Sequence, residues 1–105
     1  MPETHSDADP RTRLIALAKA DLADRLALSV AGIDLKQFKA VTWRDGSLGC
    51  PAPDGVYTQA LVKGYSLVLS QGETDYHYHA SAAGKPFLCP EGRRRPPLSA
   101  GSEKL

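Results

Sequence analysis

The segment from Trp43 to His79 constrains the fold more than any other part of the chain. It concentrates glycine, proline, cysteine, tryptophan and tyrosine, which are residue types that demand particular backbone geometry or supply polar chemistry. A solvated linker would not use them at this density. The segment therefore predicts a small, turn-rich β domain.

A long loop is expected inside this segment, over residues 44–56. Asp45-Gly46 and Asp54-Gly55 are turn dipeptides, and the prolines at positions 51 and 53 exclude a central strand between them. Loops of this length in compact domains are usually either functional or disordered. Because this one contains leucine, cysteine and proline, we expect it to be ordered and packed.

The composition excludes several classes of function. The 105 residues carry 13 basic and 12 acidic side chains, and a formal net charge of +1 offers no global field for nucleic acid or an acidic membrane surface. No apolar run approaches the roughly 18 residues of a membrane span. Residues 1–9 are acidic and polar, the reverse of a secretory signal. We therefore expect a cytoplasmic protein without a nucleic-acid or membrane partner.

The two cysteines, Cys50 and Cys89, are expected to stay reduced in that compartment. In an exported chain, a bridge between them would stabilise the fold by roughly 3–4 kcal/mol on the chain-entropy model. Because the sequence shows no export signal, the reduced form is the expectation.

An amphipathic helix is predicted near the N-terminus. Asp9-Pro10 is a good helix start, because aspartate caps free amides and proline is tolerated at the first helical position. We expect the helix to end near Leu28 and to cover one face of a sheet. Apolar residues recur along it at intervals of three and four, at Leu14, Ile15, Ala18, Leu22 and Leu26.

Five runs predict strands of that sheet, at residues 33–43, 57–62, 65–70, 74–79 and 86–89. In the first run, the apolar residues of one parity are Ile33, Leu35, Val41 and Trp43. The third and fourth runs form a hairpin, and a two-residue turn between them fixes which side chains share a face. One face, expected to pack on the helix, carries Tyr65, Leu67, Leu69, Tyr76 and Tyr78. The other, more polar face carries Ser66, Val68, Ser70, His77 and His79.

The predicted fold class is α+β, with one N-terminal amphipathic helix packed on an antiparallel sheet of about four or five strands. A single domain is expected over residues 9–89, after a disordered lead-in at residues 1–8. Residues 90–105 consist mainly of glycine, arginine, proline and serine and are predicted to form a disordered tail. The run Arg93-Arg94-Arg95 is interpreted as part of that solvated tail rather than as a nucleic-acid site.

His77 and His79 are candidate metal ligands, since their rings project from one face of a strand about 6–7 Å apart at the backbone. Paired imidazoles can hold zinc or copper, with Cys50 or Cys89 completing the ligand set. The chain lacks the close cysteine and histidine spacing that is typical of zinc sites. Half-exposed strand histidines are therefore the simpler interpretation, and no cofactor is expected.

Catalysis by a Cys50 nucleophile with a histidine base is disfavoured. Pro51 has no amide hydrogen, so the usual oxyanion donor beside the nucleophile is missing. Cys50 is better explained as a small buried side chain in a packed loop. The sequence contains no Gly-rich phosphate loop and no nucleophile elbow. We do not expect an enzyme.

The preferred function is a non-enzymatic binding or interaction module for a protein or peptide partner, as a monomer or a homodimer. The alternative is a small metal-binding protein that uses the two histidines. Trp43 is expected to anchor the loop or close the end of the sheet. The expected binding surface comprises Trp43, Asp45, Ser47, Cys50, Tyr57, His77 and His79.

Several spaced motifs support a resemblance over roughly residues 14–89. They are Trp43-x-Asp45-x-Ser47-Leu48-Gly49-Cys50-Pro51, Tyr57-x-Gln59, Gly64-Tyr65-x-Leu67-x-Leu69 and Tyr76-x-Tyr78-His79. In this pattern the chain resembles a group of small uncharacterised bacterial proteins and secreted modules, which place a similar helix in front. Arg44 departs from the group, which often has proline there. The resemblance brings no activity or site residue with it. The order of elements is also similar to that of cystatin-like and propeptide modules, which act by binding.

Overall fold

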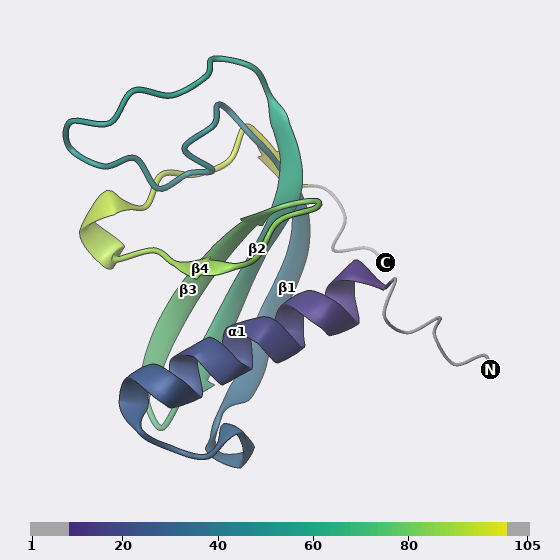
Figure 1. Ribbon diagram of the computed structural model, residues 1–105, viewed down its shortest axis with the longest axis vertical. Helices are drawn as coiled ribbons and strands as arrows, with labels where there is room; N and C mark the ends of the chain where they lie inside the picture. The colour runs from purple at the N-terminus through teal and green to yellow at the C-terminus, as the bar shows by residue number, and fades with distance from the viewer. Residues whose placement is uncertain (1–8, 101–105) are drawn as a thin grey trace.

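The computed structural model describes residues 9–100, and in it one helix lies across one face of an antiparallel sheet (Figure 1). The elements in chain order are helix α1 (Pro10–Leu26), 3-10 turn η2 (Val30–Gly32), strands β1 (Asp34–Trp43), β2 (Val62–Gln71), β3 (Thr74–Ser81) and β4 (Phe87–Leu88), 3-10 turn η3 (Glu91–Arg93) and strand β5 (Ser99–Ala100). The strand order is β4-β3-β2-β1-β5. The predicted α+β class is confirmed. The predicted lead-in at residues 1–8 lies outside the described residues.

Helix α1 begins and ends with recognisable caps. The Asp9 carboxylate accepts a hydrogen bond from the Arg11 amide at 3.0 Å, and Pro10 occupies the first turn. Ala27 has the left-handed φ of 58° that ends many helices. The buried stripe comprises Leu14, Ala18, Leu22 and Ala23. The expected helix therefore forms, and it ends close to the predicted position.

Strand β1 changes face part-way along its length. Its register against β2 shifts between Leu35 and Gln37, which marks a β-bulge. Ile33 and Leu35 consequently pack in the core under the helix, whereas Trp43 stacks on His79 on the opposite face. The prediction that all the apolar residues of one parity share a face is therefore wrong, because one extra residue reverses the alternation.

The β2–β3 hairpin has the predicted register. Leu67 pairs with Tyr78, and Ser66 pairs with His79. Gly72 takes a φ of 64° in the turn, a conformation that favours glycine. The core under the helix receives Leu67, Leu69, Tyr78 and Ala80 from the hairpin. The face opposite the helix, which carries Trp43, Ser66, Val68, His77 and His79, is called the loop face below.

A partly buried hydrogen bond joins the helix to the sheet. The Tyr78 hydroxyl donates to the Asp21 carboxylate at 2.7 Å, and Arg25 pairs with the same carboxylate at 2.6 Å. Burial alone would raise the pKa of Asp21, but the bonds from Tyr78 and Arg25 outweigh it and lower that pKa. Burial and the same carboxylate raise the pKa of Tyr78 far above its ordinary value. The contact therefore keeps a charged acceptor against a neutral phenol.

Two segments differ from the predictions. Residues 57–61 form no strand, so the loop between β1 and β2 runs from residue 44 to residue 61. The predicted disordered tail at residues 90–105 is wrong for residues 90–100, because they contain η3 and β5, and β5 pairs with β1. Both segments gather at the end of the sheet remote from the β2–β3 turn (Figure 1). Residues 101–105 lie outside the described residues. Within residues 9–100, no helix has the length and apolar character needed to cross a membrane.

Candidate functional site

The first half of the loop is shaped by its own polar side chains. One carboxylate oxygen of Asp45 accepts hydrogen bonds from the Ser47 amide at 2.9 Å and the Ser47 hydroxyl at 2.6 Å. These bonds lower the pKa of Asp45. The Tyr57 hydroxyl accepts a bond from the Ala52 amide at 2.9 Å, which closes a second turn. Asp45, Ser47 and Tyr57 were predicted as binding residues, and the structure uses their polar groups to hold the loop.

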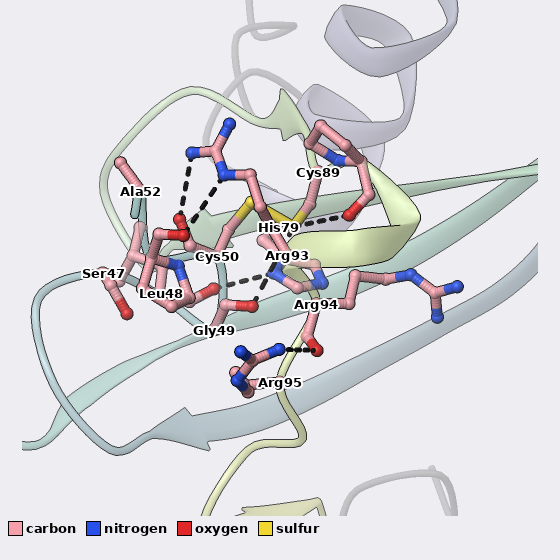
Figure 2. The surroundings of a disulfide bond; sticks show 12 residues. Ser47, Leu48, Gly49, Cys50, Ala52, His79, Cys89, Arg93, Arg94 and Arg95 are labelled. Atoms are coloured by element: carbon pink, nitrogen blue, oxygen red, sulfur yellow. Dashed lines mark hydrogen bonds between the residues drawn. A yellow bond between two sulfur atoms is a disulfide. The ribbon is translucent and has the colours of Figure 1, made fainter. Parts of the chain in front are cut away.

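Cys50 and Cys89 form a disulfide, with their Cα atoms 5.8 Å apart (Figure 2). The bond joins the middle of the loop to the residue after β4. The prediction of reduced cysteines is therefore wrong for this structure. The fold brings together two residues 39 positions apart at a distance that suits a disulfide.

The segment after Cys89 is held against the loop by backbone carbonyls. The Arg93 guanidinium donates to the Pro51 oxygen at 3.2 Å and to the Cys50 oxygen at 3.3 Å, as Figure 2 shows. The Arg95 amide donates to the Gly49 oxygen at 2.9 Å. These bonds explain why an arginine-rich stretch without a strong apolar pattern is ordered. Its ordering depends on acceptors that only the folded loop presents.

Trp43 and His79 form the floor of the loop face. Their rings stack with centroids 4.5 Å apart, and the side chains are 1% and 3% exposed. The Trp43 indole donates to the Ala80 oxygen at 3.0 Å. A Cβ atom at Gly49 would collide with the indole ring, so glycine is needed for the loop to approach this closely. Trp43 thus contacts both the sheet and the loop, as expected of a residue that anchors the loop or closes the end of the sheet.

His79 has one ring nitrogen committed to the loop. Its Nδ1 lies 2.7 Å from the Leu48 carbonyl oxygen, and a carbonyl can only accept, so Nδ1 carries the proton. Leu48 has a left-handed φ of 56°, an uncommon conformation for a branched residue. The imidazole therefore holds the carbonyl of a strained turn in place.

A solvent-accessible hollow of about 330 Å³ lies over the loop face. It is called the central hollow, and it is lined by Gln37, Trp43, Ser66, His77, His79, Arg94, Arg95, Pro96 and Pro97. None of these residues is acidic. Three of the seven predicted binding residues, Trp43, His77 and His79, meet in it. Asp45 and Ser47 line a separate, smaller hollow, and Cys50 is sealed in the disulfide.

A second hollow adjoins the central hollow and has a different charge character. It measures about 540 Å³ and includes Asp75, His77, Glu91 and Arg94 in its lining. His77 and Arg94 therefore stand on the border between the two. Burial, followed by the charge of Arg94, lowers the pKa of His77, although Asp75 and Glu91 oppose this.

The structure leaves the predicted metal site without its sulfur ligands, because Cys50 and Cys89 are bonded to each other. One nitrogen of His79 is also committed to Leu48. Among the residues that the structure describes, no group of three or more histidine, cysteine, aspartate or glutamate side chains is arranged to hold a metal ion. A site built from the histidines and a thiolate would therefore require reduction of the disulfide.

Sequence reasoning missed the arginine and proline residues of the site. The sequence predicts a solvated tail at Arg94, Arg95, Pro96 and Pro97, yet these residues line the central hollow. The most direct available signal was Cys89, since a bridge to Cys50 necessarily places the following residues beside the loop. Gln37 was missed for a different reason, because the bulge in β1 turns it towards the loop face.

The comparisons with known proteins give a family without a described activity. A protein-family model described as "Domain of unknown function (DUF8738)" matches residues 15–89. The chain belongs to this family. The match includes α1, the loop and both histidines, and it ends at Cys89, so Arg94 and Arg95 lie beyond it. No curated protein and no solved structure matches the chain.

The buried imidazole of His79 predicts a pH-dependent stability. Burial lowers the pKa of His79, and His77 and Arg94 add to this, although the Leu48 carbonyl opposes it. The unfolded state therefore takes up a proton near pH 6.5, at which folded His79 remains neutral. The free energy of unfolding should fall as the pH drops from about 6.5 through the folded pKa. Urea unfolding measured between pH 7.5 and 5 checks this.

The matched variant for that experiment is His79→Phe, which keeps an aromatic ring against Trp43 and cannot titrate. It should be less stable at every pH, because the Leu48 carbonyl loses its donor. Its stability should nevertheless depend less steeply on pH than that of the wild type. Equal slopes in the two proteins would show that His79 makes no contribution to the pH dependence.

Proposed function

We propose that this protein is a small, non-enzymatic binding module that receives its ligand in the central hollow. The observation that carries the proposal is the convergence of Trp43, His77, His79 and Arg94 on one accessible hollow of about 330 Å³. This volume lies at the lower end of the range for small-molecule sites. It suits a compact ligand or one side chain of a peptide partner.

The rigidity of the surroundings supports binding. The disulfide, the Arg93 bonds and the β1–β5 pairing hold the two walls of the hollow on one sheet. A preformed site binds its ligand without the entropy cost of ordering loops. The long loop thus supports the site from behind, because its Gly49, Cys50 and Pro51 carbonyls hold the arginine segment that lines the hollow.

The groups that would be needed for covalent catalysis are otherwise engaged. The Cys50 sulfur is in the disulfide and cannot act as a thiolate nucleophile. His79 Nδ1 bonds to a backbone carbonyl, and across residues 9–100 neither histidine ring is bonded to a serine hydroxyl. These contacts support a binding role over a catalytic one.

Chemical-shift mapping tests the proposal. The amide spectrum of the protein is followed while a library of small acids, bases, neutral aromatics and short peptides is added. At least one class of compound should produce saturable shifts that concentrate on Ser66, His77 and His79. If no compound does so, the central hollow is not a binding site.

Two serines on the same strand and face provide a matched control. Ser66 lines the central hollow, whereas Ser70 lies four residues further along β2 and outside it. Ser66→Leu should fill the hollow and abolish the shifts, and Ser70→Leu should leave them intact. Shifts that survive in Ser66→Leu would place the binding elsewhere and overturn the assignment.

A further inference from the structure

The charged side chains that line the central hollow are both basic. Arg94 and Arg95 line it together with His77 and His79, and no lining residue is a carboxylate. The whole chain, in contrast, is almost neutral. The arrangement therefore concentrates positive charge at one place and does not reflect a generally basic protein.

Arg94 has a donor with nothing to bond to. Its Nε atom is buried and has no hydrogen-bond partner among the described residues. The carboxylate of Glu91 lies 4.0 Å from Arg94 Nη2, and the Glu91 side chain is 91% exposed. Such a contact is at the limit of an ion pair and is screened by water. A buried donor left unpaired costs free energy, so a missing acceptor is expected at this position.

The neighbouring arginines differ from Arg94 in this respect. The Arg93 guanidinium donates hydrogen bonds to the Pro51 and Cys50 carbonyls, and Arg95 Nη1 donates to the Arg94 carbonyl. In Figure 2 the Arg94 side chain extends away from the disulfide and from the loop carbonyls that hold Arg93. Arg93 thus has a structural role, and Arg94 retains the planar donor fork that suits an oxyanion.

We infer that the central hollow binds an oxyanion, a phosphate or carboxylate group of a small ligand, whose oxygens accept hydrogen bonds from the Arg94 guanidinium. This inference rests on the proposed function and names the class of ligand. Ser66 and Gln37 supply neutral polar groups beside the anion, and Pro96 and Pro97 form its apolar wall. The indole of Trp43 closes the floor.

His77 gives the bound state an independent signature. Burial, followed by the charge of Arg94, lowers the pKa of His77 in the free protein, although Asp75 and Glu91 oppose this. A bound anion offsets the charge of Arg94 and stabilises the imidazolium, so the pKa of His77 should rise when the site is saturated. The Cε1–H resonance of the ring reports this change directly. A ligand that only altered the ionic strength would screen the charges without saturating.

The experiment is a titration of the full chain with inorganic phosphate in one arm and propionate in the other, at constant ionic strength with sodium chloride. Saturable shifts at His77 and Ser66, with a raised pKa of His77, are expected in at least one arm. The arm that responds identifies a phosphate or a carboxylate source. Shifts that follow sodium chloride equally well would overturn the inference.

Variants assign the effect to Arg94. Arg94→Gln should weaken binding at least about tenfold, because a charge-assisted hydrogen bond is lost. Lys85→Gln removes the same charge outside the hollow and should bind as the wild type does. Arg94→Lys keeps the charge but lacks the Nε donor, so it should also bind more weakly and serves if Arg94→Gln is unstable. Unchanged affinity in the Arg94 variants would refute the role of this residue.

This test is separable from that of the proposed function. A neutral or cationic compound that binds saturably in the central hollow, while phosphate and propionate do not, would overturn the oxyanion inference and support the binding module. If no compound binds saturably, and neither phosphate nor propionate produces saturable shifts, then both the oxyanion inference and the proposed binding function are overturned.

Discussion

Removal of the Cys50–Cys89 disulfide is expected to lower the free energy of unfolding by about 4 kcal/mol, because it releases a closed loop with a sequence separation of 39 residues. A typical domain has only about 5–15 kcal/mol of stability in total. The reduced protein should therefore unfold at much lower urea concentration. Urea unfolding with and without a phosphine reductant measures the difference.

The double variant Cys50→Ala/Cys89→Ala is the control for this experiment. It should match the reduced wild type and show no response to reductant. Hydrogen exchange should also localise the effect, with faster exchange at the Gly46 and Arg95 amides, which bond within and onto the loop. If the free energy of unfolding changes by less than about 1 kcal/mol, then the other contacts alone hold the loop and the segment after Cys89 together, and the chain-entropy argument is contradicted.

The disulfide also bears on where the protein works. Disulfides persist in oxidising compartments, whereas cytosolic thiols are normally kept reduced. The predicted cytoplasmic location and a permanent Cys50–Cys89 bond therefore conflict. Alkylation of the protein in freshly lysed source cells, followed by a mass measurement, decides between them. Two alkylated thiols would mean that the protein exists in the cell without the Cys50–Cys89 disulfide.

The parts of the fold that sequence predicted well are those fixed by local periodicity. The stripe from Leu14 to Leu26 defines a helix, and alternation in the hairpin defines which side chains meet. Because parity alone placed His77 and His79 together, the histidine half of the central hollow was predictable. The same alternation failed in β1, where a bulge that has no local signature moved Gln37 to the loop face.

The arginine half of the site could not be read from composition. Residues 90–98 have few apolar side chains, so nothing in their pattern indicates packing. Their order comes from long-range partners, since Arg93 and Arg95 bond to carbonyl or backbone groups of the loop. Polar segments that are ordered by backbone acceptors elsewhere in the fold resemble disordered tails when taken alone.

Replacement of Trp43 by alanine should cost about 3–5 kcal/mol of stability, the usual range for truncation of a buried tryptophan. Three contacts are lost together. They are the stack on His79, the hydrogen bond to the Ala80 carbonyl and the close packing against Gly49. The loss therefore spans the sheet and the loop. Because Trp43 is the only tryptophan, unfolding of the variant is followed by circular dichroism.

The matched control is Val56→Ala, a truncation in the same loop at a side chain that is 95% exposed. It should change stability by less than about 0.5 kcal/mol, as surface substitutions usually do. Trp43→Ala should also raise the mobility of the His79 ring, which loses its stacking partner. The affinity of the central hollow for any ligand should therefore fall, even where the variant is folded. A loss of stability below about 1.5 kcal/mol would show that the loop face is not organised around Trp43. The indole would then only pack against the end of the sheet, and the disulfide and Arg93 would hold the loop in place.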